Sequence, residues 1–340
     1  MYIFLKMQSI LDNWIQTDNK QKICNIMYLN WSETNPKVLW LLKPPEDVIF
    51  KKKINWNKIN VEVLICGNID SNLEQFPEKF KYTSLLKSNL QKCIRQGLVS
   101  KSLSTAKLMI KTDFIEFIRR LSIIMLEDTT LNIHFNTLMW MIAAYPQWLP
   151  NKKHINWLLG LVKYLAELPV KDNIEKGVFD FKQSMSIINS LSDIDKSIIY
   201  CLNLRLSYGG MKGDMSMIQY LINLWINRFK NRDNLEYVYN DVISYSTKIK
   251  NIKVNEIEES AVDFHCYPKI LNLIRIKFLK YSLEEIKLSI WHNRSSKNIR
   301  RNINNLKLDD SIEQKYIDIW IEITQEVSKI SKNYIKNLLL

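Results

Sequence analysis

The sequence predicts a mainly α protein: a helical bundle with a small mixed α/β or irregular region at its N-terminus. Glycine and proline are scarce, with Gly 7 and Pro 8 in 340 residues, against usual shares of about 7% and 5%. Sheet-rich folds use these residues in tight turns, so their scarcity favours long helices. Apolar residues also recur at helical spacing through most of the chain after Tyr82.

The first 80 residues show a different pattern. Two short runs rich in Val, Leu and Ile, residues 37–42 and 61–66, are bounded by Pro-Pro and Gly-Asn pairs. Such runs predict strands or buried extended segments. Residues 48–53 end in three lysines, which predicts an exposed edge or loop, and a short helix is expected at residues 10–15.

Two helices are predicted at the start of the bundle, within residues 84–131. In the first, Leu86, Leu90 and Ile94 recur at helical spacing, and Gly97 lies where a helix would stop. The second covers residues 99–110, with one continuous apolar face.

A third helix is predicted to begin at Asp113, an N-cap candidate with Glu116 three residues later. It ends in Glu127 and Asp128, although carboxylates at a helix C-terminus oppose the macrodipole. Such a broken rule can mark a paired or functional site. The alternative is that Asp128 caps the following helix.

The order of several short motifs in this bundle is similar to a known family. The motifs are residues 88–95 (SNLQKCIR), Gly97, Ala106, residues 119–121 (RRL) and residues 127–128 (ED). They resemble the helical C-terminal collar of clamp-loader-like AAA+ ATPases of the replication-associated recombination (Werner-interacting) type. The resemblance covers roughly residues 82–171, where residues 158–169 look like a later collar helix.

The chain departs from that family in two places. Thr130 or a neighbour stands where the family has a glycine after the acidic pair. No phosphate loop of the form G-x-x-x-x-G-K-[ST] occurs, and the region before Tyr82 is too short for an ATPase module of about 200 residues. The resemblance therefore implies a collar without its motor, which assembles and lies beside DNA without hydrolysing nucleotide.

The rest of the chain also predicts helices. The expected segments are residues 133–145, 155–168, 196–207, 215–229, 235–252 and 309–340. We expect three consecutive regions: 1–80 as the mixed region, 81–171 as the collar-like bundle, and 172–340 as a C-terminal helical region.

The net charge of +13 favours anionic partners, nucleic acid first and DNA before RNA. An AT-rich genome, cellular or viral, would inflate the lysine count without selection for binding. The candidate nucleic-acid-binding residues are Lys92, Arg95, Arg119, Arg120, Arg294, Lys297, Arg300 and Arg301. They suit phosphate contacts, and the alternative is a solvated basic face.

A glycine-rich loop lies at residues 208–214. Gly209, Gly210, Lys212 and Gly213 could hold a phosphate at the N-terminus of the following helix. No strand precedes the loop and its spacing fits no nucleotide fingerprint, so a helix–helix corner is the favoured interpretation.

Four residues suggest metal chemistry. Asp263, His265 and Cys266 lie together, and His292 follows. They could form a zinc or nuclease metal site. Their spacing fits no standard motif, so a polar His265 beside a small core Cys266 is the favoured interpretation, and no cofactor is expected.

Five scattered cysteines without a C-x-x-C pair favour reduced thiols in an intracellular setting, the cytoplasm or the nucleus. No signal peptide and no apolar run of about 18 residues occurs, which predicts no membrane partner.

Three functional hypotheses follow. The first is a non-catalytic, nucleic-acid-associated helical scaffold of DNA replication, recombination or repair, which self-associates or binds proteins through its bundle. The second is an interaction subunit of a larger complex without direct nucleic-acid binding. The third is a metal-dependent nuclease built on the Asp263 cluster.

Overall fold

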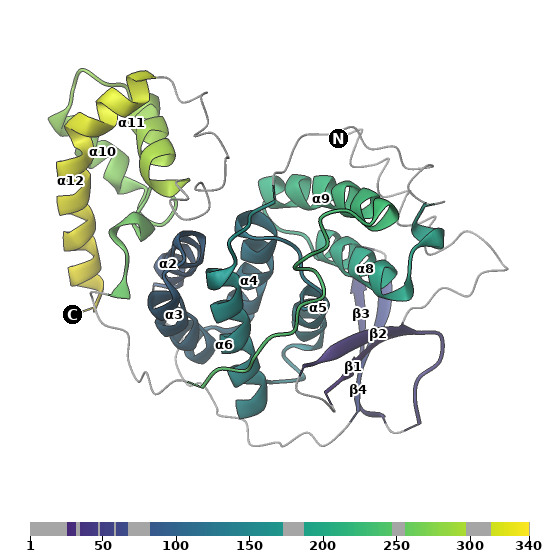
Figure 1. The fold of residues 1–340 in the computed structure, drawn as a ribbon. Helices are drawn as coiled ribbons and strands as arrows, with labels where there is room; N and C mark the ends of the chain where they lie inside the picture. The colour runs from purple at the N-terminus through teal and green to yellow at the C-terminus, as the bar shows by residue number, and fades with distance from the viewer. Residues whose placement is uncertain are drawn as a thin grey trace. The chain divides into compact units, whose positions relative to one another are not determined.

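The computed structural model describes residues 26–31, 35–46, 48–57, 59–66, 82–172, 187–246, 256–296 and 314–339. Helices dominate it, and a four-stranded sheet lies near the N-terminus (Figure 1). The expected fold class is therefore confirmed. The expected helix at residues 10–15 lies outside the described residues.

The chain divides into two compact units, each built from separate segments. The first unit comprises residues 1–74, 125–154 and 172–243, and the second comprises residues 75–124, 155–171 and 244–340. The first unit thus draws on all three of the regions expected from the sequence.

The sheet of the first unit consists of two hairpins side by side. Its strands are β1 (Ile26–Asn30), β2 (Lys37–Leu41), β3 (Val48–Trp56) and β4 (Ile59–Cys66). Their order is β2-β1-β4-β3, with antiparallel outer pairs and a parallel central pair. The strands expected at residues 37–42 and 61–66 are confirmed. β1 is an addition to the predicted strands.

One face of the sheet packs on helices α5 (Phe135–Ala144) and α8 (Asp193–Tyr208) (Figure 1). Met27, Leu29 and Val63 share this face and are fully buried. From α5, Trp140 is also fully buried and donates its indole N–H to the Leu64 carbonyl, 2.9 Å away. The indole joins the helix to the central strand pair.

β3 is an edge strand, as the three lysines predicted. Lys51 and Lys53 point to one face of the sheet and pair with Glu62 at 3.0 and 3.3 Å. Lys52 points to the other face and donates to the Tyr145 carbonyl at 2.6 Å. A cation at the end of α5 satisfies a carbonyl that the helix itself leaves unpaired.

The helix expected at residues 235–252 is wrong. α9 (Lys212–Asn231) ends at Arg232, whose φ is +56°, and Asn234 also has a positive φ. The described residues that follow, 233–246, form turns and irregular backbone. Val238 and Val242 are buried four residues apart, so they imitate helical spacing while they anchor a loop. The main chain confirms this, because the Val238 carbonyl accepts a hydrogen bond from Ile133 N at 2.8 Å.

The second unit contains most of the predicted bundle. Its helices are α2 (Thr83–Gln96), α3 (Val99–Thr112), most of α4 (Phe114–Asp128), most of α6 (Lys152–Glu167), α10 (Lys269–Lys277), α11 (Leu283–Ile290) and α12 (Gln314–Leu339). Two short turns are η2 (Glu259–Ala261) and the π-helical η3 (Trp291–Ser295). None of these described helices has the length and apolarity needed to cross a membrane.

The predicted helix ends in this unit are confirmed. Gly97 ends α2 in the left-handed conformation, with φ of 71°. Asp113 caps α4, since its side chain accepts a hydrogen bond from Glu116 N at 3.3 Å. The Glu116 carboxylate binds Lys87 at 2.7 Å.

Asp128, at the acidic end of α4, does not cap the next helix. Asp128 is the last residue of α4 and is fully buried. α5 begins only at Phe135, with His134 as its N-cap residue. Asp128 therefore lies too far upstream to cap α5, and that alternative is wrong.

Candidate functional site

Asp263 is the centre of a buried ionic network in the second unit. It follows η2, and its carboxylate accepts a hydrogen bond from the Lys92 ammonium of α2 at 2.5 Å. The two side chains are only 4% and 5% exposed. Lys92 also donates to Ser88 at 3.2 Å, and the second Asp263 oxygen accepts from His265 N at 2.8 Å. Both charged groups are thus paired and hydrogen-bonded, as burial of charge requires.

Two arginines extend this network toward α12. Arg95, one turn after Lys92, donates to the Ser295 carbonyl in η3. Arg294 is also buried and donates to the Ser331 hydroxyl of α12 at 3.1 Å. Its guanidinium lies 3.7 Å from the Glu259 carboxylate, which Lys332 also approaches at 3.2 Å. We call this set the Asp263 network: Ser88, Lys92, Arg95, Glu259, Asp263, Arg294, Ser295, Ser331 and Lys332.

Asn89 was missed by the sequence analysis as a member of the same interface. Its fully buried amide accepts a hydrogen bond from Glu258 N at 2.8 Å and donates to the Glu256 carbonyl at 3.2 Å. It also donates to the Thr105 hydroxyl of α3 at 2.7 Å. The sequence pattern that could have identified Asn89 is a polar residue beside Leu90, between the apolar positions of the helix.

Burial and the neighbouring charges shift the pKa values of the network in opposite directions. Burial alone would raise the pKa of Asp263, but hydrogen bonding to His265 and the charge of Lys92 outweigh it and hold that pKa well below its usual range. Burial lowers the pKa of Lys92, while Asp263 opposes this. Burial also lowers the pKa of Arg294 to about 10, so the guanidinium stays protonated at neutral pH. The arrangement is a set of buried ion pairs and hydrogen bonds that joins α2, η3 and α12.

The residues proposed for metal binding do not converge. Among the described residues, no three His, Cys, Asp or Glu side chains could hold a metal ion together. The Cys266 thiol approaches the Ala261 carbonyl at 3.1 Å, and the ring of His292 stacks on Tyr316 with centroids 5.8 Å apart. His265 forms its contact with Asp263, whose other oxygen Lys92 already occupies. These positions fit the structural interpretation and not a ligand set.

The Cys266 thiol provides a direct test. Burial and the negative charge of Asp263 raise its pKa to about 11, so the thiolate that a metal or a nucleophile needs is scarce at neutral pH. We expect the rate at which iodoacetamide alkylates Cys266, followed by site-resolved mass spectrometry, to rise until about pH 11. Alkylation that levels off at pH 8 to 9, as for a free cysteine of pKa about 8.5, would contradict this placement.

Three of the eight predicted nucleic-acid-binding residues are buried inside the protein. Lys92, Arg95 and Arg294 are buried in the Asp263 network, so their assignment to a surface is wrong. They were mistaken for surface cations because the sequence does not show their distant partners. Of the two arginines on α4, Arg119 pairs with Glu116 at 2.5 Å and Arg120 donates to Gln91 at 3.3 Å. Lys297, Arg300 and Arg301 lie outside the described residues.

The glycine-rich loop forms a corner between α8 and α9. The guanidinium of Arg205, buried below it, donates to the Gly209 carbonyl at 2.7 Å. Gly210 lies so close to this guanidinium that a Cβ there would be 3.7 Å from it and 3.1 Å from Met215. Gly209 and Gly210 both have a positive φ, of 86° and 157°, which glycine adopts without strain. The loop is the helix–helix corner that the sequence favoured. Lys212 and Gly213 form the first turn of α9.

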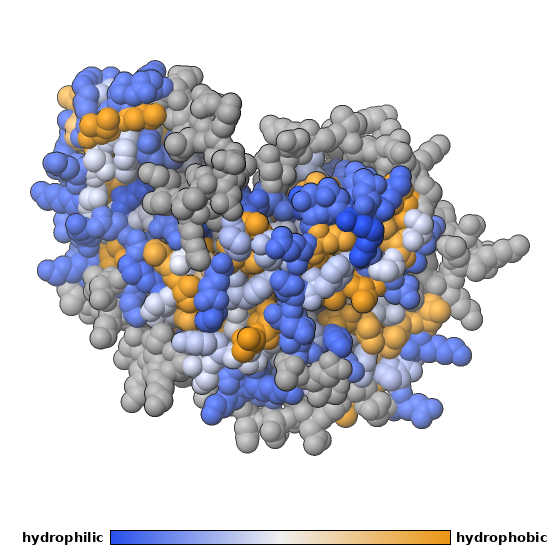
Figure 2. Space-filling model, in the orientation of Figure 1, coloured by the Kyte–Doolittle hydropathy of each residue, from blue (hydrophilic) through white to orange (hydrophobic). Residues whose placement is uncertain are grey.

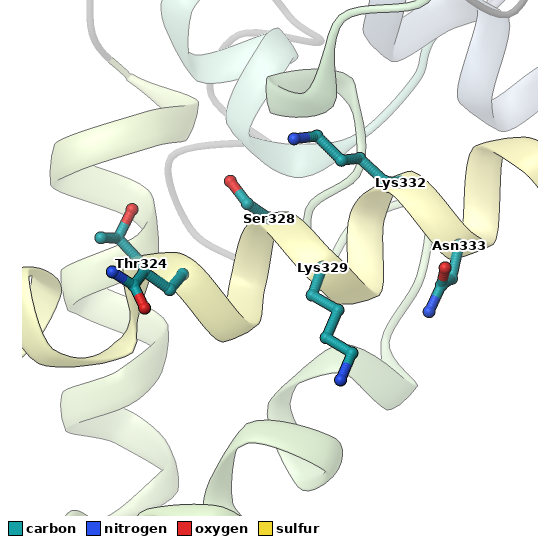
Figure 3. Close-up of a pocket in the computed structure, with 6 residues that line it drawn as sticks. Thr324, Ser328, Lys329, Lys332 and Asn333 are labelled. Carbon is teal, nitrogen blue, oxygen red and sulfur yellow. The ribbon is translucent and has the colours of Figure 1, made fainter.

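A shallow groove runs along α12 in the second unit. Its volume is about 480 Å³, and its lining residues are Thr324, Gln325, Ser328, Lys329, Lys332 and Asn333. Figure 3 shows Ser328 and Lys332 on one side of the helix and Lys329 and Asn333 on the other. The sequence analysis missed this groove. The sequence pattern that could have indicated the groove is the pair of small polar residues at positions 324 and 328, which lie four apart on one helix face.

No protein-family model, curated protein or solved structure matched the chain in comparison. The resemblance to AAA+ collars therefore stays a prediction.

Proposed function

We propose that this chain is a non-catalytic helical assembly subunit, which joins partner proteins in a larger complex. The observation that supports this most strongly is the Asp263 network. Lys92, Arg95 and Arg294, the cations that the sequence offered to nucleic acid, hold α2, η3 and α12 together within the second unit. Buried ion pairs of this kind define one arrangement of helices more than they add stability.

The described polar clusters support the same interpretation. The Cys266 thiol is protonated at neutral pH, and the Asp263 carboxylate is already paired with Lys92. Neither group is available as a nucleophile or a general base. The resemblance to AAA+ collars supports an assembly of DNA replication, recombination or repair as its setting.

The test is the size of the chain's native complex, measured by size-exclusion chromatography of an extract of the cells that produce it. We expect elution well above the 40.4 kDa of the single chain, unchanged after nuclease digestion. The matched control is the purified recombinant chain, run with and without nuclease. Elution of the native chain as a 40.4 kDa monomer before digestion would contradict the proposal.

A second candidate function is direct nucleic-acid association through the groove on α12. Lys329 lies there among short hydroxyl and amide side chains, beside Lys332, which also approaches Glu259. Such side chains suit contacts to phosphates. The net charge of +13 favours the same partner. The chromatography separates the two functions, because a complex held by nucleic acid collapses to the monomer on digestion.

A further inference from the structure

α10 and the turn that follows it present three aliphatic side chains to solvent. Leu273 and Ile276 lie on the helix and are 38% and 70% exposed, and Leu279 lies in the turn and is 80% exposed. The other side of the helix is fixed in the core, where Ile270 and Ile274 are fully buried. Leu273 and Ile276 are three apart and therefore neighbours on the helix surface. We call Leu273, Ile276 and Leu279 the α10 stripe.

The α10 stripe is held on a rigid support. Beside it, Lys277 pairs with Glu326 at 2.6 Å and Lys280 pairs with Glu322 at 2.7 Å, which ties the C-terminal end of α10 and the following turn to α12. Figure 2 shows a few hydrophobic residues among the hydrophilic residues in the region of α10, α11 and α12. Scattered exposed aliphatic residues are ordinary, but three within seven residues, on a helix and the turn that follows it, form a candidate interaction surface.

The rim of the α10 stripe is positively charged. Residues 269–281 contain four cations and no acidic residue. Lys277 and Lys280 are neutralised by their partners on α12. Lys269 and Arg275 are exposed, and no described acidic residue pairs with either. A partner that buries the stripe must therefore meet two uncompensated positive charges.

We propose that the α10 stripe binds an acidic amphipathic segment of a partner protein, with its apolar side on Ile276 and Leu279 and its carboxylates beside Lys269 and Arg275. This inference rests on the proposed assembly function and names the surface that performs it. A helix with apolar anchors at helical spacing fits such a surface, and the complementary charge gives it specificity.

Two other occupants fit less well. A second copy in a two-fold dimer would place Lys269 and Arg275 against the same residues of its twin, and like charges repel. Single-stranded nucleic acid gains much of its affinity from stacking on aromatic rings, whereas Leu273, Ile276 and Leu279 are aliphatic.

The first experiment measures binding of a labelled peptide to the full chain by fluorescence anisotropy. The peptide has about 18 residues, with leucines at helical spacing and glutamates elsewhere. Its controls are a scrambled peptide of the same composition and a version with lysine for glutamate. We expect the acidic amphipathic peptide to bind at least tenfold more tightly than either control.

Three double variants test where the peptide binds. Ile276→Ser with Leu279→Ser should weaken peptide binding at least tenfold, whereas Ile243→Ser with Leu42→Ser, which removes exposed aliphatic residues of the first unit, should leave it unchanged. Lys269→Glu with Arg275→Glu should reverse the preference toward the lysine peptide. Equal binding of the three peptides would overturn the proposal. So would displacement of the peptide by a DNA oligonucleotide or by anionic vesicles, if that displacement persists in the Ile276→Ser, Leu279→Ser variant.

The native complex separates this inference from the function on which it rests. If the Ile276→Ser, Leu279→Ser variant elutes as the monomer while wild type and the Ile243→Ser, Leu42→Ser control stay in the large complex, the α10 stripe is the docking surface. If all three stay in the complex, the proposed docking role of the α10 stripe is contradicted and the proposed assembly function is not. If wild type itself elutes as a monomer, the proposed assembly function is contradicted.

Discussion

Replacing Lys92 with methionine is expected to lower the free energy of unfolding by about 3–5 kcal/mol, because it leaves the buried Asp263 carboxylate without its charge partner. Methionine keeps most of the volume of the lysine stem, so the change isolates the charge. The measurement is urea unfolding of the full chain at neutral pH. The matched control is Lys111→Met on α3, where the lysine is exposed and the expected change is within about 0.5 kcal/mol.

A second variant and a pH series test the reason for that loss. Lys92→Met with Asp263→Asn removes both charges and keeps an oxygen for His265 N, so it should recover at least half of the lost stability. Asp263 has a folded-state pKa below its unfolded value of about 3.9, so its contribution is present above about pH 4 and is lost as the pH falls through the folded pKa. In Lys92→Met the Asp263 carboxylate can instead protonate. The difference in the free energy of unfolding between this variant and wild type should therefore narrow as the pH falls from 7 toward 4. A difference that stays constant over this pH range would contradict the ion-pair explanation.

Replacing Trp140 with alanine is expected to lower the free energy of unfolding by about 3–5 kcal/mol. This is the usual range for removing a large aromatic side chain from a core. Trp140 is fully buried beneath the sheet and meets Trp148 edge-on with ring centroids 5.1 Å apart. Its loss would also leave the Leu64 carbonyl without its side-chain donor. The measurement is again denaturant unfolding, followed by circular dichroism.

Two further substitutions separate the contribution of the indole N–H from that of apolar packing and provide an exposed control. Trp140→Phe keeps most of the apolar contact and removes the indole N–H, so its cost should be about 1–2 kcal/mol. Trp291→Ala is the control, because Trp291 is exposed and its loss should cost less than about 1 kcal/mol. A Trp140→Ala variant as stable as this control would show that the indole is not the joint between α5 and the sheet.

Local rules were enough to predict most of the helices. Gly97 and Asp113 define helix ends through their own backbone and side-chain preferences, so neighbouring residues sufficed to place α2, α3 and α4. The same rules failed after Arg232, where Val238 and Val242 have helical spacing but anchor a loop. Periodicity reports which residues are buried and does not report the backbone that buries them.

The candidate site could not be predicted in the same way. Lys92 and Asp263 are separated by 171 residues, and Arg95 and Ser295 by 200. Nothing near Lys92 distinguishes it from Lys87 of the same helix, which is only half-buried. The sequence did place Asp263 and Cys266 in a polar cluster, and the structural interpretation of that cluster fits the positions found here.

The long separation inside the Asp263 network also has a consequence for synthesis of the chain. α2 leaves the ribosome well before Asp263, the counterion of Lys92, has been translated. At about 5–20 residues per second the delay is on the order of 10–30 s. During that interval the nascent bundle can bury its aliphatic side chains but not the lysine, so the second unit reaches its final packing only after the last third of the chain has emerged.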